Sequence, residues 1–198
     1  MKFYTADFHL NSSGIIKWIK RPFKNAQHMN RYLIHECNNS AKSKTDVIYH
    51  IGDFCNTGCE KGFETLRINP KVHIEEIQAT LILLQGNHDG NNKVKSHMNY
   101  CFTDIGNLYH NVSIGHFPSY TEDAKGQFLP HTIRLCGHVH KAYKWTLDKT
   151  NDVLNINMGV DVWRYHIVSE TDLIRYLDFL TRRSELISFR PTSLLNAN

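Results

Sequence analysis

The sequence predicts an α/β (α+β) fold in which short strands end at polar loops and helices lie between the strands. Three apolar, β-prone runs support this prediction, at residues 2–6, 46–51 and 80–84, because each leads directly into side chains that can bind metal ions. In open sheets, ligands gather beyond the carboxyl ends of the strands. We therefore expect these loops to meet at one edge of a sheet and to form a site there.

Between these runs the spacing of apolar residues favours helices. Residues 15–23 form an apolar and basic segment that Pro22 breaks. A helix is expected from Asn25, since four apolar residues recur there at helical spacing: Met29, Leu33, Ile34 and Cys37. Residues 62–77 are expected to form helical segments interrupted at Pro70.

The second half of the chain continues the alternation of strands and loops. Strands are expected at residues 111–114 and 132–135, and a β-hairpin is expected to join residues 143–147 to residues 153–156. The last helix is expected to begin near Ser169, at a capping-box-like pattern, and its apolar stripe consists of Leu173, Tyr176, Leu177 and Leu180.

Length and composition indicate one folded domain. The 198 residues fit a single domain, expected to span residues 1–190, with residues 191–198 as a frayed tail. Lys+Arg (23) and Asp+Glu (19) nearly balance, which is too weak an excess to indicate nucleic-acid binding. The five cysteines are odd in number and irregularly spaced, so no disulfide framework is indicated. Without a signal peptide or a long apolar run, the protein is expected to be cytoplasmic and away from membranes.

Five short stretches place potential metal ligands beside a glycine or at a strand end. They are Asp7-Phe8-His9, Gly52-Asp53, Gly86-Asn87-His88-Asp89, Gly115-His116 and Gly137-His138-Val139-His140. Carboxylate and amide oxygens suit hard dications and imidazole suits Mn, Fe, Ni or Zn, so this mixture favours first-row transition metals. No cysteine lies inside a stretch, and a thiolate zinc site is not indicated. Together the stretches predict one site that binds two metal ions and attacks a phosphate ester.

The stretches resemble the ordered motifs of the calcineurin-like metallophosphoesterase superfamily, which are D-x-H, GD, GNH[D/E], GH and GHxH. Residues 5–9 followed by Arg21-Pro22-Phe23, together with residues 157–163, resemble a compact bacterial and phage branch of predicted phosphoesterases. The resemblance implies a two-sheet β-sandwich flanked by helices, with a dinuclear metal site at one end. The stretch after Gly52-Asp53 lacks the arginine of the protein-phosphatase pattern G-D-x-x-D-R, which disfavours a protein phosphatase.

The resemblance also implies a role for each motif residue. The first ion would be held by Asp7, His9, Asp53 and His140, and the second by Asp53, Asn87, His116 and His138. Manganese is expected for both ions, with Fe, Ni or Zn as alternatives, and a metal-bridged hydroxide would attack the phosphorus. His88 would protonate the leaving oxygen or stabilise charge on the phosphate, and Asp89 would orient the His88 ring. In a strand-like segment His138 and His140 would point the same way, each toward one ion.

Residues outside the five stretches can have structural or functional roles. Asn157 or Asp161 would either shape a turn or hydrogen-bond a metal-ligating histidine, whereas Trp163 is expected to pack in the core. Arg21 lies in a basic cluster that is expected to be a solvated face, with Lys17, Lys20 and Lys24. Structural roles are expected for His28, His35, His50, His73, His97, His110 and His166. His131 is the exception, for which a place in the pocket wall stayed an alternative.

The predicted function is hydrolysis of phosphate esters, with phosphodiesters slightly preferred over monoesters because His88 would assist a poor alkoxide leaving group. Small esters such as nucleotides are the expected substrates, and nucleic acid is an alternative partner that the composition does not indicate. A nuclease of the DNA-repair type would need a larger basic track and extra domains. A non-catalytic scaffold on the same fold would be marked by lost ligands, and none is lost here. The sequence leaves the natural substrate and the oligomeric state open.

Overall fold

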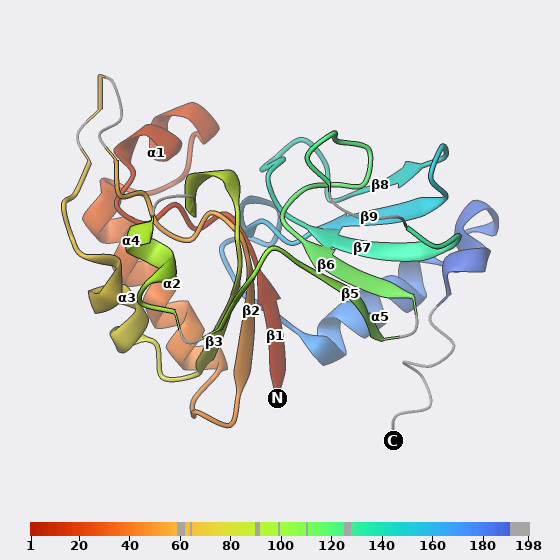
Figure 1. The fold of residues 1–198 in the computed structure, drawn as a ribbon, viewed down its shortest axis with the longest axis horizontal. Helices are drawn as coiled ribbons and strands as arrows, with labels where there is room; N and C mark the ends of the chain where they lie inside the picture. The colour runs from red at the N-terminus through yellow and green to blue at the C-terminus, as the bar shows by residue number, and fades with distance from the viewer. Residues whose placement is uncertain are drawn as a thin grey trace.

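Two five-stranded sheets pack against each other in the computed structural model (Figure 1), which describes residues 1–58, 62–63, 65–89, 92–98, 100–109, 111–124 and 128–190. The first sheet has the order β10-β1-β2-β3-β4, with bounds Val168–Ser169, Lys2–Thr5, Val47–Ile51, Thr80–Leu84 and Tyr100–Phe102. The second has the order β5-β6-β7-β9-β8, with bounds Asp104–Tyr109, Val112–Gly115, Thr132–Cys136, Val153–Asn157 and Trp145–Asp148. This architecture confirms the predicted two-sheet fold.

Parallel pairing brings strand ends to the same edge of each sheet. In the first sheet β1 pairs in parallel with β2, β2 with β3, and β3 with β4. In the second, β6 pairs in parallel with β7, and β7 with β9. The carboxyl ends of these strands therefore face one region, from which the polar loops emerge. The predicted hairpin is confirmed as the antiparallel pair of β8 and β9.

Five α-helices of the described residues cover the sheets: α1 (Ser13–Ile19), α2 (Ala26–Ser40), α3 (Pro70–Glu76), α4 (Asn92–Lys95) and α5 (Glu170–Leu180). Helices α1 to α4 lie on the outer side of the first sheet, and α5 lies beside the second (Figure 1). Asn25 and Ser169 cap α2 and α5 through their side chains, as the sequence predicts. None of the helices in the described part of the chain has the length and apolarity needed to cross a membrane.

One helix was not predicted, and one expectation about a helix was wrong. The sequence describes residues 15–23 only as apolar and basic, but the Ser12 side chain accepts a hydrogen bond from the N–H of Ile15 and starts the short helix α1. Among residues 62–69, the described ones form no helix, and α3 begins at Pro70 instead of breaking there. Proline suits the first turn of a helix because its missing N–H has no partner at that position. His110 and residues 191–198 lie outside the described residues.

Two hydrophobic cores flank the first sheet because its side chains alternate between faces. Phe3 packs with α1 and α2 in one core, while its neighbour Tyr4 packs in the other core with β6, β7 and α5. On β3, Leu83 and Leu84 divide in the same way. Helices on one face and the second sheet on the other thus hold the ligand-bearing strand ends in place.

His50 lies in the first core, on β2, and confirms its expected structural position. Its side chain is completely buried, with edge contacts to the rings of Phe8 and Phe54 at centroid distances of 4.5 and 5.1 Å. Neither ring nitrogen has a hydrogen-bond partner among the described residues. Burial lowers the pKa of His50 to about 3, because the charged imidazolium would lose its hydration in this apolar environment.

This burial predicts an acid-sensitive contribution to stability. The folded pKa lies below the unfolded value, so the unfolded chain binds the proton first as the pH falls through about 6.5. Between about pH 7 and pH 5 the wild type should lose about 2 kcal/mol more unfolding free energy than His50→Leu, a difference measured by urea denaturation at both pH values. Equal losses in the two proteins would contradict the prediction.

Candidate metal centre and active site

Five strand ends deliver the predicted ligands to one place. The loops after β1, β2 and β3 carry Asp7, Asp53 and Asn87, and those after β6 and β7 carry His116 and residues 138–140. Backbone hydrogen bonds tie the first two loops together. The Asp7 N–H donates to the carbonyl of Gly52 at 3.0 Å, and the His9 N–H donates to the carbonyl of Asp53 at 2.9 Å.

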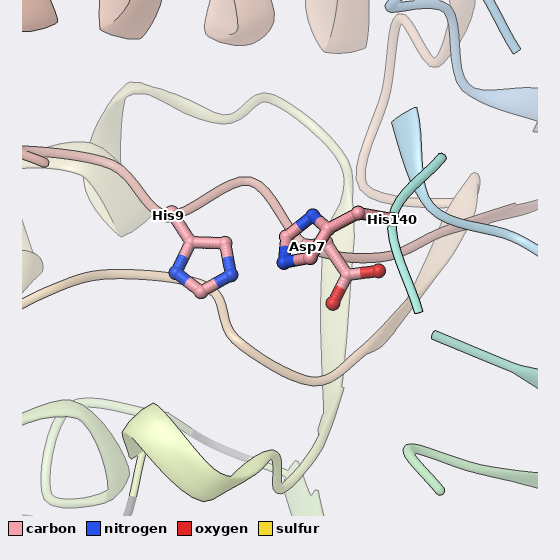
Figure 2. A group of neighbouring side chains, drawn as sticks. All are labelled: Asp7, His9 and His140. Atoms are coloured by element: carbon pink, nitrogen blue, oxygen red, sulfur yellow. The ribbon is translucent and has the colours of Figure 1, made fainter. Parts of the chain in front are cut away.

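Buried donor atoms converge around the first loop. Asp7, His9 and His140 each offer a donor atom within 4.8 Å of the others (Figure 2). A carboxylate oxygen of Asp53 lies 3.4 Å from Nε2 of His9 and 3.3 Å from Nε2 of His116. Nε2 of His9 is buried and has no hydrogen-bond partner among the described residues. An unpartnered, neutral imidazole nitrogen facing carboxylates fits a divalent ion.

A second convergence centres on the side chain of Asn87. Its Oδ1 lies 3.1 Å from Nε2 of His116 and 3.1 Å from Nδ1 of His138. The other ring nitrogen of His116, Nδ1, lies 2.9 Å from the carbonyl of Ile51. In the neutral ring, donation of a proton from Nδ1 to that carbonyl leaves the Nε2 lone pair directed toward Asn87, as in metal-ligating histidines.

The backbone at these residues is unusual. Five of the seven predicted ligands have a positive φ angle: Asp7 (59°), His9 (49°), Asp53 (56°), His138 (72°) and His140 (47°). Non-glycine residues rarely adopt this left-handed region, and such conformations concentrate at functional sites. The segment from His138 to His140 is therefore a turn, and the expectation of a strand-like segment was wrong. The side chains still converge, because the turn and not a strand alternation directs them.

Two motif glycines leave room for ligand side chains. A Cβ atom on Gly52, whose φ is 84°, would lie 2.2 Å from Nδ1 of His116. A Cβ atom on Gly86 would lie 2.3 Å from Oδ1 of Asp53. Any larger residue would push a ligand out of the cluster, which explains why glycine precedes the ligands of these motifs.

The electrostatics of the cluster favour a cation. Burial raises the pKa of Asp7, because its carboxylate loses hydration. Burial also opposes ionisation of Asp53, but a hydrogen bond from His116 and its charge hold the pKa below the usual range. His116 is the counterpart: burial lowers its pKa, yet the hydrogen bond and charge of Asp53 and the charge of Asp7 raise it to about 9. Burial lowers the pKa of His9, which keeps that ring neutral and able to bind a metal.

His88 lies at the exposed edge of the cluster. Its backbone N–H donates to Oδ1 of Asp53 at 2.8 Å, and its ring stands 5.0 Å from the His9 ring. A ring nitrogen of His88 falls within 4.8 Å of donor atoms of His9 and Asp53. Proximity therefore does not separate His88 from the ligands. Its exposure does set it apart from the buried Asp53 and His9, because a substrate can reach it from solvent.

Asp89 has a different role from the one predicted. Its carboxylate is fully buried and accepts hydrogen bonds from the backbone N–H groups of Asp53, Phe54 and Gly86, at 2.7, 2.9 and 2.9 Å. Burial raises the pKa of Asp89 to about 6. The carboxylate thus joins the loops after β2 and β3, whereas the sequence placed it against the ring of the exposed His88.

Asp161 and Asn157 both contact the His140 turn. Oδ2 of Asp161 lies 2.9 Å from Nδ1 of His140, which confirms that one of the two polar residues contacts a predicted ligand ring. Nδ2 of Asn157 donates to the carbonyl of His140 at 2.7 Å. Trp163 packs at the edge of the second core and donates from Nε1 to the carbonyl of Asn157 at 2.7 Å. His131 lies away from the site, on the surface and paired with an aspartate.

One cavity borders the cluster, and a second is lined by residues that follow Asp53 in the sequence. The smaller, of about 250 Å³, has Asn87 and His116 in its wall. The larger, of about 610 Å³, is lined by Asn56, Thr57, Gly58, Thr65, Leu66, Arg67, Ile68, Asn69, Pro70 and His97. We call it the 56–70 cleft. It begins three residues after Asp53, where the N–H of Asn56 donates to the carbonyl of Leu10 at 2.8 Å.

Sequence comparisons show which known proteins this chain is similar to. The sequence model of the calcineurin-like phosphoesterase family matches residues 4–183. An uncharacterized protein of Methanocaldococcus jannaschii is 28% identical over 178 residues, covering 87% of this chain and 89% of the relative.

A solved structure shares the fold. A protein of unknown function from Aquifex aeolicus superposes with a TM-score of 0.64 at 18% identity, covering 89% of this chain and 98% of that one. A nuclease of Pseudomonas putida aligns with a TM-score of 0.45 at 15% identity, over 70% of this chain and 60% of the nuclease. The family match spans nearly the whole described chain, and the chain belongs to the calcineurin-like phosphoesterases, a family of metal-dependent hydrolases.

Proposed function

We propose that the protein is a dinuclear metal-dependent phosphoesterase that prefers phosphodiesters. The observation that carries the proposal is the convergence of carboxylate, amide and imidazole donors from five strand ends, of which Asp7, His9, Asp53 and His116 are buried. One ion is assigned to Asp7, His9, Asp53 and His140, and the other to Asp53, Asn87, His116 and His138. Manganese is the first candidate for both ions, because the donor set mixes oxygen and imidazole nitrogen.

The metal ions, His88 and Asp89 have separate roles in the proposed reaction. When bound, the two ions supply Lewis acidity, which lowers the pKa of a water molecule and stabilises charge on the phosphate oxygens. His88 is exposed beside the cluster, where its ring can give a proton to the departing oxygen. Asp89 holds the Asp53 loop by accepting hydrogen bonds from the backbone N–H groups of Asp53 and Phe54.

The 56–70 cleft supports a nucleotide-like substrate. Its volume of about 610 Å³ lies within the range of small-molecule sites. Its wall combines apolar side chains, suited to a base, with the exposed Arg67 guanidinium, suited to phosphate. No ion pair of Arg67 is present within the described residues. Asn56, which lines the cleft, follows Asp53 by three residues, so its backbone lies roughly 10 Å or less from that of the proposed bridging ligand.

Hydrolysis of two chromogenic esters tests the proposed function. We expect Mn²⁺-dependent hydrolysis of bis-p-nitrophenyl phosphate at a higher kcat/KM than of p-nitrophenyl phosphate. The reverse order would replace the diesterase assignment with a monoesterase. If metal-loaded protein hydrolyses neither ester and no nucleotide, the enzyme assignment is wrong and a non-catalytic scaffold is favoured.

Arg67→Ala tests the substrate class. We expect KM for a dinucleotide to rise roughly tenfold, the loss of a charge-assisted hydrogen bond, while KM for bis-p-nitrophenyl phosphate stays unchanged. Lys71→Ala is the matched control, because Lys71 is an exposed cation on neighbouring α3 that pairs with Glu75 at 3.5 Å and does not line the cleft. Equal effects of the two substitutions would exclude a specific role for Arg67.

A further inference from the structure

The two stretches that mark the compact branch meet in the structure as a buried ion pair. Arg21 follows α1, and Asp161 lies in a single 3-10 turn at Val160–Val162. Nε of Arg21 donates to Oδ1 of Asp161 at 2.9 Å, and a second guanidinium nitrogen donates to Oδ2 at 2.8 Å. Both side chains are completely buried. The expectation that Arg21 belongs to a solvated basic face was therefore wrong.

Arg21 also binds the loop that carries the first ligands. Its two terminal nitrogens donate to the carbonyls of Phe8 and Asp7, at 2.8 and 2.7 Å. The guanidinium thus spans the D-x-H loop on one side and Asp161 on the other. A buried arginine that satisfies two backbone carbonyls and a carboxylate at once fixes their relative positions.

Asp161 extends the connection to the far ligand. Its Oδ2, which accepts from Arg21, also lies 2.9 Å from Nδ1 of His140. Because a carboxylate only accepts, this contact places a proton on Nδ1 of His140 and leaves Nε2 free as a lone pair. The chain of contacts joins Asp7, on the first strand end, to His140, more than 130 residues later in sequence.

We propose that Arg21 and Asp161 are positioning residues that hold Asp7, His9 and His140 as one preformed half of the metal centre. This role rests on the proposed function, since it assumes that the three residues bind one ion together. A purely structural ion pair would stabilise the fold without distinguishing the two ions. The positioning role instead predicts that loss of the pair weakens the binding of one ion and not of the other. The described contacts of the pair do not reach Asn87, His116 or His138.

The test is titration of metal-free, full-length protein with Mn²⁺ alone, followed by calorimetry. We expect two binding events in the wild type. In Arg21→Lys and in the isosteric Asp161→Asn, one event should weaken by roughly 10–100-fold while the other is unchanged. The double variant should lose no more than either single variant, because the two residues act as one ion pair, and removal of either partner breaks it.

Two further measurements separate positioning from stability. Leu177→Ala, a core substitution on α5, should lower the melting temperature of the metal-free protein and leave both binding events intact. Nitrogen NMR of the metal-free protein should show His140 protonated on Nδ1 in the wild type and on either nitrogen in Asp161→Asn.

The proposal would be overturned if the variants bound both ions equally more weakly, or bound both as tightly as the wild type. It would also be overturned if His140 of the wild type carried its proton on Nε2. Wild-type protein that binds two ions but hydrolyses no phosphate ester would remove the proposed function alone. In that case selective loss of one ion in the variants would still support the positioning role.

Discussion

Asp53→Asn should empty the metal centre and reduce hydrolysis to the background rate. The substitution keeps the shape of the side chain and removes the charge of a carboxylate that lies 3.4 Å from Nε2 of His9 and 3.3 Å from Nε2 of His116. Under the proposed assignment each ion would lose its shared anionic ligand, and a neutral amide binds a dication more weakly. Metal content after dialysis, measured by mass spectrometry, should fall from two ions per chain toward none.

The control for Asp53→Asn is Asp148→Asn, which removes another buried carboxylate at the end of β8. Asp148 accepts from the side chains of Ser119 and Asn151 and lies outside the ligand cluster. This variant should keep both ions. Retention of one tightly bound ion in Asp53→Asn would show that Asp53 serves only one ion and does not bridge.

His88→Ala should keep both ions and lose turnover. The His88 ring is exposed at the edge of the cluster, whereas the assigned ligands Asp7, His9, Asp53 and His116 are buried. General acid catalysis contributes roughly 10²–10⁴-fold, so kcat for a dinucleotide should fall by that factor. Steady-state kinetics combined with metal analysis of the same sample measures both quantities.

The leaving group gives a sharper test of the His88 role. An alkoxide needs a proton as it departs, whereas p-nitrophenolate leaves readily without one. His88→Ala should therefore impair hydrolysis of a dinucleotide far more than hydrolysis of bis-p-nitrophenyl phosphate. If the variant loses metal, or if both substrates suffer equally, His88 is a ligand or a phosphate-binding residue and not the acid.

The fold could be predicted where patterns are local. The strands β1, β2 and β3 are short apolar runs that end at polar residues, and their parallel pairing follows from the crossover helices between them. Helix α1 escaped prediction because seven residues with a basic surface show too little periodicity. Residues 62–69 contain helix-forming residues, but propensity is a weak prior that tertiary context overrides.

The candidate ligands could be predicted from the sequence, but the residues that hold these ligands in place could not. The motif spacing identifies Asp7, His9 and His140, which the structure brings together. The ion pair of Arg21 and Asp161 joins residues 140 positions apart, and no local pattern distinguishes such an arginine from a solvated one. Composition alone would place an arginine at the surface, since buried charges are rare unless paired.

Diffraction from crystals grown with Mn²⁺, with data collected at the manganese absorption edge, tests the dinuclear centre most directly. We expect two anomalous peaks about 3.5–4 Å apart, with Asp53 touching both, His140 at one and His138 at the other. A single peak, or two peaks that do not share Asp53, would contradict the dinuclear assignment.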